Sequence, residues 1–159
     1  MSSWGDRQRL ESEIKALFEE ASSAGEELQA RLARYACVLA CGYIEASCRE
    51  ILSAFSAARA EGAIARYVQV RLGFFTGPRT EKMLQLVGEF DPSRKVQLEA
   101  AIDERLKDGI NSICAHRNNI AHGRGSSISM GQLKSYFQCA TEVIGKMRGL
   151  FPVRRASGG

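Results

Sequence analysis

The chain has 159 residues, of which 45% are hydrophobic and 25% charged, and a formal net charge of +4. This balance predicts an ordinary folded domain with its own core. No apolar run approaches the roughly 20 residues that a bilayer-spanning helix needs, and the first residues lack the layout of a signal peptide, so we expect a cytoplasmic protein with no membrane contact. Five cysteines, an odd number, argue against a disulfide framework.

The first half of the chain shows helical spacing of apolar residues. A helix is predicted over residues 10–21 and a long one over residues 26–60, whose apolar side we assign to seven residues: Leu28, Leu32, Tyr35, Leu39, Tyr43, Ala46 and Phe55. Cys37, Cys41 and Cys48 lie within about 40° of one another on that helix. We interpret them as a buried stripe of small residues and expect no structural zinc.

A shorter helix follows, with Ile64, Tyr67, Val68 and Leu72 on its apolar side. Residues 73–78 contain two glycines and a proline and must form a loop. Phe74 and Phe75 within this loop either contact a base or pack into the core. Thr80 is expected to cap the next helix.

The second half of the chain contains clear helix starts. Asp91-Pro92 places Asp at the N-cap and Pro at the first helical position, and apolar residues from 96 to 113 predict one continuous helix. Ser129 with Gln132 forms a capping box for the last helix, which ends near residue 150. We predict an all-α bundle of about five or six helices, a single domain over residues 1–152 and a disordered tail over residues 153–159.

The run Arg117-Asn118-Asn119-Ile120-Ala121-His122-Gly123 carries the chemistry. Arginine holds phosphate in a rigid donor fork, and histidine exchanges protons near neutral pH. Asn118 and His122 share a helix face, and Gly123 is placed to end the helix. The pattern suggests chemistry on a phosphodiester.

RNA can be cleaved without a metal. The 2′-hydroxyl attacks the adjacent phosphorus while a base takes its proton, and an acid protonates the leaving 5′-oxygen. His116 lies about 240° from His122 on a helix, and we interpret it as an ordinary surface or core residue. If both acid and base are histidines, two copies of His122 are needed, and a two-fold dimer supplies them.

Positive charge gathers around this run. From Ser112 onward there are seven basic residues and one acidic residue, which leaves residues 1–111 at −2. A basic last third suits a polyanionic partner such as RNA, although Arg154 and Arg155 alone are also explained as part of a solvated tail.

The motif Arg-Asn-x-x-Ala-His-Gly, followed by a last amphipathic helix, resembles the HEPN superfamily, and residues 41–45 (Cys-Gly-Tyr-Ile-Glu) resemble the early helix of its RiboL-PSP-HEPN subgroup. The resemblance covers residues 30–150 and implies a small all-α domain. Active members are metal-independent endoribonucleases that act as dimers, and many serve as toxins or in anti-phage defence, in some cases silenced by a partner antitoxin.

The resemblance also assigns roles. Arg117 binds and polarises the phosphate, His122 transfers the proton, and Asn118 assists as the polar residue after the arginine; we expect Asn119, Arg124 and Glu45 to contact the substrate. Arg124 stands where members silenced by tyrosine modification carry the tyrosine, so that form of silencing is not expected. Glu45 also fits a surface or interhelical ion pair.

Two other functions remain open from the sequence. Some members lack nuclease activity, so the chain also fits a non-catalytic helical module that binds RNA, a nucleotide or a protein partner, or a purely structural dimerisation domain. No metal or cofactor is expected in any of the three.

Overall fold

The computed structural model describes residues 6–153. Within them the chain forms seven helices and no strand: α1 (Asp6–Ser22), α2 (Glu26–Arg59), α3 (Gly62–Leu72), α4 (Thr80–Phe90), α5 (Pro92–Ala101), α6 (Glu104–Ala121) and α7 (Met130–Leu150). The all-α fold is confirmed, but seven helices replace the five or six that were predicted. The predictions for Met1–Gly5, Arg154, Arg155 and most of the C-terminal tail lie outside the described residues.

The additional helix arises because the helix predicted across residues 92–113 is broken. Ile102 adopts an extended backbone conformation (φ −101°, ψ 112°) at the end of α5. Asp103 then starts α6 as its N-cap, and its carboxylate accepts a hydrogen bond from the N–H of Leu106 at 2.9 Å. An N-cap of this kind stabilises a helix start by about 1 kcal/mol. The apolar spacing continued through the break and concealed it.

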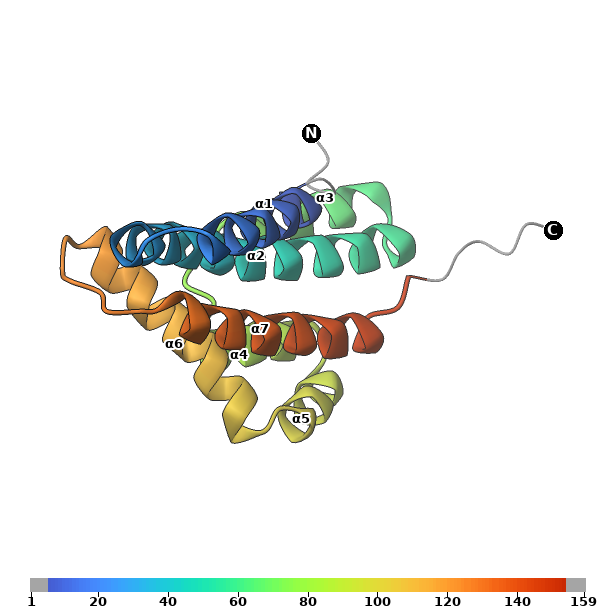
Figure 1. The fold of residues 1–159 in the computed structure, drawn as a ribbon. Coiled ribbons are helices and arrows are strands. Elements are labelled where there is room, and N and C mark those ends of the chain that lie inside the picture. Colours follow the sequence, from blue (N-terminus) through green and yellow to red (C-terminus); the bar gives the residue numbers. More distant parts are fainter. Residues whose placement is uncertain (1–5, 154–159) are drawn as a thin grey trace.

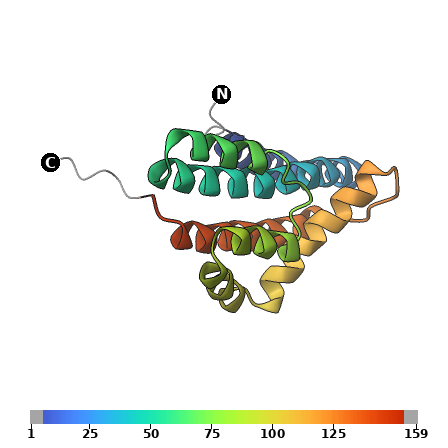
Figure 2. The ribbon, with the colours of Figure 1, turned by 180° about the vertical axis from the view of Figure 1, so that it is seen from behind.

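The helices form two groups connected by α6 (Figure 1). α1 and α2 pack against each other, with α3 beside α2, while α4, α5 and α7 lie on the other side. α6 runs obliquely from the α5 side to the N-terminal half of α2, and the view from behind shows the same arrangement (Figure 2). The C-terminal end of α6 therefore lies at one edge of the molecule.

Small residues make up much of the core face of α2. Cys37, Cys41 and Cys48 are buried, as the sequence predicted, and the thiol of Cys37 donates to the carbonyl of Ile113 on α6 at 3.5 Å. The larger side chains were partly misassigned, because Tyr35 is 49% exposed. Small side chains let α6 pack close to α2.

The apolar side predicted for α3 is also wrong in part. Leu72 is buried, but Ile64 and Tyr67 are exposed. Thr80 does not cap α4: Arg79 is the N-cap residue and makes no side-chain cap bond. Periodicity identified α3 correctly as a helix but could not show that little of the protein covers it.

Other predicted helix ends are confirmed. The side chain of Asp91 accepts the N–H of Ser93, with Pro92 in the first turn. Ser129 and Gln132 form both bonds of the capping box. In the intervening loops, Phe75 is buried and Phe74 is 75% exposed, so the predicted core packing holds for Phe75 only.

α6 and α7 approach each other closely at Gly109. A Cβ added to this glycine would lie 2.5 Å from the Cβ of Cys139 on α7, closer than real Cβ atoms come. Only glycine fits here without a shift of the helices, so Gly109 fixes the position of α6 against α7.

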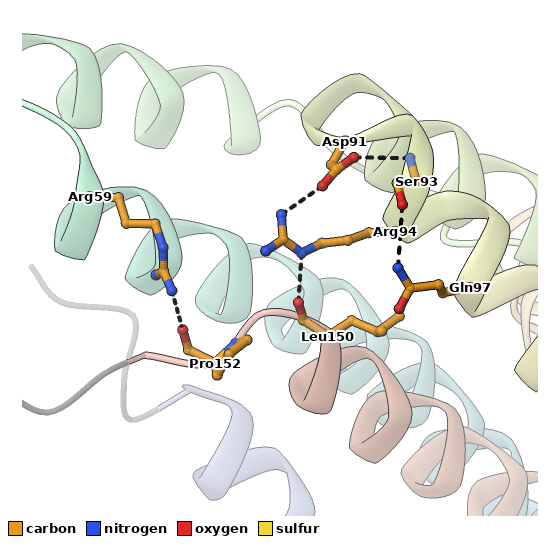
Figure 3. A network of polar contacts seen from close by, with 7 residues as sticks. All are labelled: Arg59, Asp91, Ser93, Arg94, Gln97, Leu150 and Pro152. Carbon is orange, nitrogen blue, oxygen red and sulfur yellow. Dashed lines mark hydrogen bonds and ion pairs between the residues drawn. The ribbon is translucent and has the colours of Figure 1, made fainter.

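A polar network closes the far end of the molecule, around the C-terminus of α7 (Figure 3). Arg94 on α5 donates to the carbonyl of Leu150 at 2.8 Å and pairs with Asp91 at 2.7 Å. Arg59 at the end of α2 donates to the carbonyl of Pro152 at 2.9 Å. Both arginines therefore have structural partners.

No helix in the described part of the chain is long and apolar enough to cross a membrane.

Candidate functional site

The motif residues lie at the C-terminal end of α6. His122 is the C-cap residue, and Gly123 follows in the left-handed conformation with φ 68°. The N–H of Gly123 donates to the carbonyl of Ile120 at 3.2 Å, and that of Arg124 to the carbonyl of Asn119 at 2.8 Å. These two bonds form a Schellman motif and confirm the predicted helix end. His122, directly before Gly123, is exposed.

Arg117 continues the buried stripe of α6. Leu106, Ile110 and Ile113 are all at most 1% exposed and face the core. Arg117 comes four residues after Ile113, about 40° away on the helix, yet it is exposed. Its guanidinium makes no hydrogen bond or ion pair with residues 6–153. A charged group thus stands where the stripe would place another apolar side chain.

The polar side chains next to Arg117 are also available to bind a ligand. Asn118 and Asn119 are half-buried, Arg124 is exposed, and within the described part of the chain none of their side chains has a hydrogen-bond partner. Asn118 and His122 share a face of the helix, as four-residue spacing requires. The structure therefore presents a guanidinium, an imidazole and a carboxamide from one helix end to solvent.

A pair of buried thiols lies beneath this end of α6. The interaction of Cys41 on α2 with the thiol of Cys114 on α6, together with burial, raises the pKa of Cys41, and the guanidinium of Arg117 acts against that rise. The same interaction lowers the pKa of Cys114, and the guanidinium of Arg79 acts in that direction too. Both arginines are therefore close enough to one thiol pair to act on it electrostatically.

Arg79 belongs to the loop between α3 and α4, residues 73–79, which is fastened to two helices. On the α2 side, Oε1 of Glu45 accepts the N–H of Gly77 at 3.0 Å, and Arg49 donates to the carbonyl of Phe75 at 2.6 Å. On the α6 side, Oδ1 of Asn111 accepts the N–H of Thr80 at 3.0 Å.

The contacts of Glu45 bear on the role predicted for it. Its second carboxylate oxygen lies 4.0 Å from Arg49 one turn along α2. Glu45 thus positions the loop and takes part in an ion pair within its own helix, while its charge lies near both thiols. The sequence pointed to Glu45 but not to Arg79 or Asn111, whose positions depend on contacts between distant segments.

His116 lies on a different face of α6 from His122. Its Nδ1 is 2.9 Å from the hydroxyl of Ser126, which fastens the loop after α6. Among residues 6–153, no group of three His, Cys, Asp or Glu side chains could hold a metal ion.

Comparison with known proteins identifies one family. The model of the family described as RiboL-PSP-HEPN matches residues 5–151, a range that includes all seven helices. No curated protein and no solved structure matches the chain. The match confirms the predicted family for the chain as a whole and does not test the Arg-x4-His motif.

Proposed function

Because the chain belongs to the RiboL-PSP-HEPN family, we propose that it is a metal-independent endoribonuclease that leaves 2′,3′-cyclic phosphate ends. The observation that supports this most is the exposed guanidinium of Arg117, without a partner among the described residues, at the end of a stripe that is otherwise apolar and buried. His122 lies five residues further on, at the end of the same helix.

In the proposed reaction, neutral His122 accepts the proton of the 2′-hydroxyl, whose oxygen attacks the adjacent phosphorus. The bond from phosphorus to the 5′-oxygen breaks, and that oxygen takes a proton from an acid. Arg117 donates to the phosphate oxygens and stabilises the negative charge that develops on them. Asn118, on the face of His122, donates to the same phosphate or orients the imidazole, and Asn119 and Arg124 contact the RNA beyond it.

A second copy of the chain supplies the acid. The two histidines of one chain lie on different faces of α6, and His116 is hydrogen-bonded to Ser126. We therefore propose a homodimer in which two copies of the motif share one cleft, so that the imidazole of one His122 is the base and that of the other, protonated, is the acid.

An unrestrained ribonuclease of this kind would damage the cell that makes it. We propose a toxin or anti-phage effector in the cytoplasm, held inactive by an antitoxin or another regulatory protein. Arg124 occupies the position of the tyrosine that some family toxins use for silencing, so the proposed restraint acts by binding rather than by modification there.

The test is RNA cleavage in EDTA by the purified protein, with analysis of the product ends. Cleavage with 2′,3′-cyclic phosphate ends is expected, together with loss of activity in Arg117→Ala and not in Arg66→Ala, the same change at an exposed position on α3. Intact RNA with salt-sensitive binding would contradict the nuclease and indicate a binding module. Intact RNA without binding would leave only a structural role.

A further inference from the structure

We propose that Arg79 is a second phosphate-binding residue, which holds the phosphate next to the one held by Arg117 along a single strand of RNA. This rests on the proposed function, because it extends the same site by one nucleotide. It adds a residue from outside the motif, 38 positions earlier in the sequence than Arg117.

Contacts with two helices fix the position of the loop that carries Arg79. Arg79 lies between two backbone N–H groups that are bound by other elements: that of Gly77 by Glu45 on α2, and that of Thr80 by Asn111 on α6. Gly77 has φ 64°, a left-handed conformation that favours glycine. The loop is thus held between the two helices that carry the thiol pair, and Arg79 has a defined place beside α6.

Contacts with α6 place Arg79 near Arg117. Asn111, which accepts the N–H of Thr80 directly after Arg79, precedes Arg117 by six residues, about 9 Å along α6. Both arginines are exposed, and each guanidinium shifts the pKa of one of two neighbouring thiols, Arg117 that of Cys41 and Arg79 that of Cys114. The two long side chains can therefore reach the same part of the surface from different elements.

The charges around Arg79 and Arg117 also favour binding of an anion. Glu45 is the acid that acts on both thiols, and its carboxylate already accepts the N–H of Gly77 and pairs with Arg49. Lys82, also in this region, donates to the carbonyl of Thr76 at 2.6 Å. In the described part of the chain neither Arg79 nor Arg117 has an acidic partner, and two unpaired cations beside the same helix favour a polyanion.

A single strand fits this arrangement better than a duplex. Its backbone bends freely, so neighbouring phosphates can reach cations on different elements, and basic grooves that follow the backbone are typical of single-strand binding. Arg79 is proposed to bind and position the strand rather than to take part in bond breaking.

The experiment measures binding of a fluorescently labelled single-stranded RNA by anisotropy at several salt concentrations. All proteins carry His122→Ala so that the RNA stays intact. Arg79→Ala should weaken binding about tenfold, equivalent to one lost charged contact, and reduce the slope of log K against log salt by about 0.7. Arg79→Lys should restore the slope, because the charge remains. Arg66→Ala, the matched control, should change neither quantity.

Cleavage kinetics give a second readout. With His122 intact, Arg79→Ala should raise KM with little change in kcat, whereas a loss of kcat alone would overturn the positioning role. An unchanged salt slope in Arg79→Ala, with melting temperatures equal to that of the parent, would also overturn it. Wild-type protein that binds RNA through Arg79 but does not cut it would refute the nuclease and leave this inference standing.

Discussion

The parts of α6 before and after Ile113 differ in what occupies the same helical face. As far as Ile113 the face carries Leu106, Ile110 and Ile113, which are buried, and Gly109 allows the close contact with Cys139 on α7. After Ile113, the face continues with Arg117, which is exposed. The buried part of the face stabilises the fold, and the exposed part is available to bind a ligand. A change from apolar to charged along one face therefore supports the candidate site better than the Arg-x4-His spacing alone.

The sharpest separation of the two parts of this face comes from Arg117→Ala. Loss of a preorganised donor to the developing negative charge should lower kcat by a factor of about 100 to 1,000. The free energy of unfolding should change by no more than about 0.5 kcal/mol, since the side chain is exposed and unpaired among residues 6–153. Both are measured on one preparation, by RNA cleavage and by thermal unfolding. A protein that loses its fold with this change would make Arg117 structural.

The opposite behaviour is expected one helical turn earlier. Ile113→Ala removes a fully buried side chain and should lower the free energy of unfolding by about 2–5 kcal/mol. At temperatures where this variant stays folded, it should still cut RNA. Denaturant unfolding checks the first expectation, and a loss below about 1 kcal/mol would mean that the apolar part of the face is less tightly packed than described.

For α5, α6 and α3, capping residues in the sequence predicted helix ends better than periodicity predicted buried faces. Capping residues act locally, so Asp91-Pro92 and the Gly123 helix end could be read directly. The break at Ile102–Asp103 could not, because apolar residues continue across it at helical spacing. Exposure of Ile64 on α3 depends on which helices cover it, and periodicity does not contain that information.

The close approach of α6 to α7 can be tested by adding one methyl group. Gly109→Ala would place a Cβ 2.5 Å from that of Cys139 and should cost about 1–3 kcal/mol of stability, as overpacking does. Gly145→Ala on α7 is the matched control. Nothing lies within 4 Å of its added Cβ, so the better helix propensity of alanine should stabilise the protein by up to about 1 kcal/mol. Equal effects in calorimetry would refute the tight contact.

A smaller effect is expected at the helix end that presents His122. Gly123→Ala puts a side chain at φ 68° and should cost about 1 kcal/mol. Gly125→Ala, two residues on, has open space and no positive φ, so it should be close to neutral. If both variants melt at the same temperature, the left-handed helix end contributes nothing to stability.

The candidate site could be predicted only in part from the sequence, because contacts between distant segments bring some of its residues together. Arg117, Asn118 and His122 form one local pattern, so their shared position was predictable. Arg79 comes near them only because Glu45 and Asn111, from two other helices, bind the backbone of its loop. Contacts between segments more than 30 residues apart leave no spacing to recognise.

The most direct measurement compares the two histidines of α6 in one assay. RNA cleavage in EDTA should be lost in His122→Ala and largely retained in His116→Ala, with both proteins folded. Only His122 is proposed to transfer the proton, because His116 is hydrogen-bonded to Ser126. Cleavage that survives His122→Ala, or that is lost equally in both variants, would contradict the assignment of His122 as the acid–base residue.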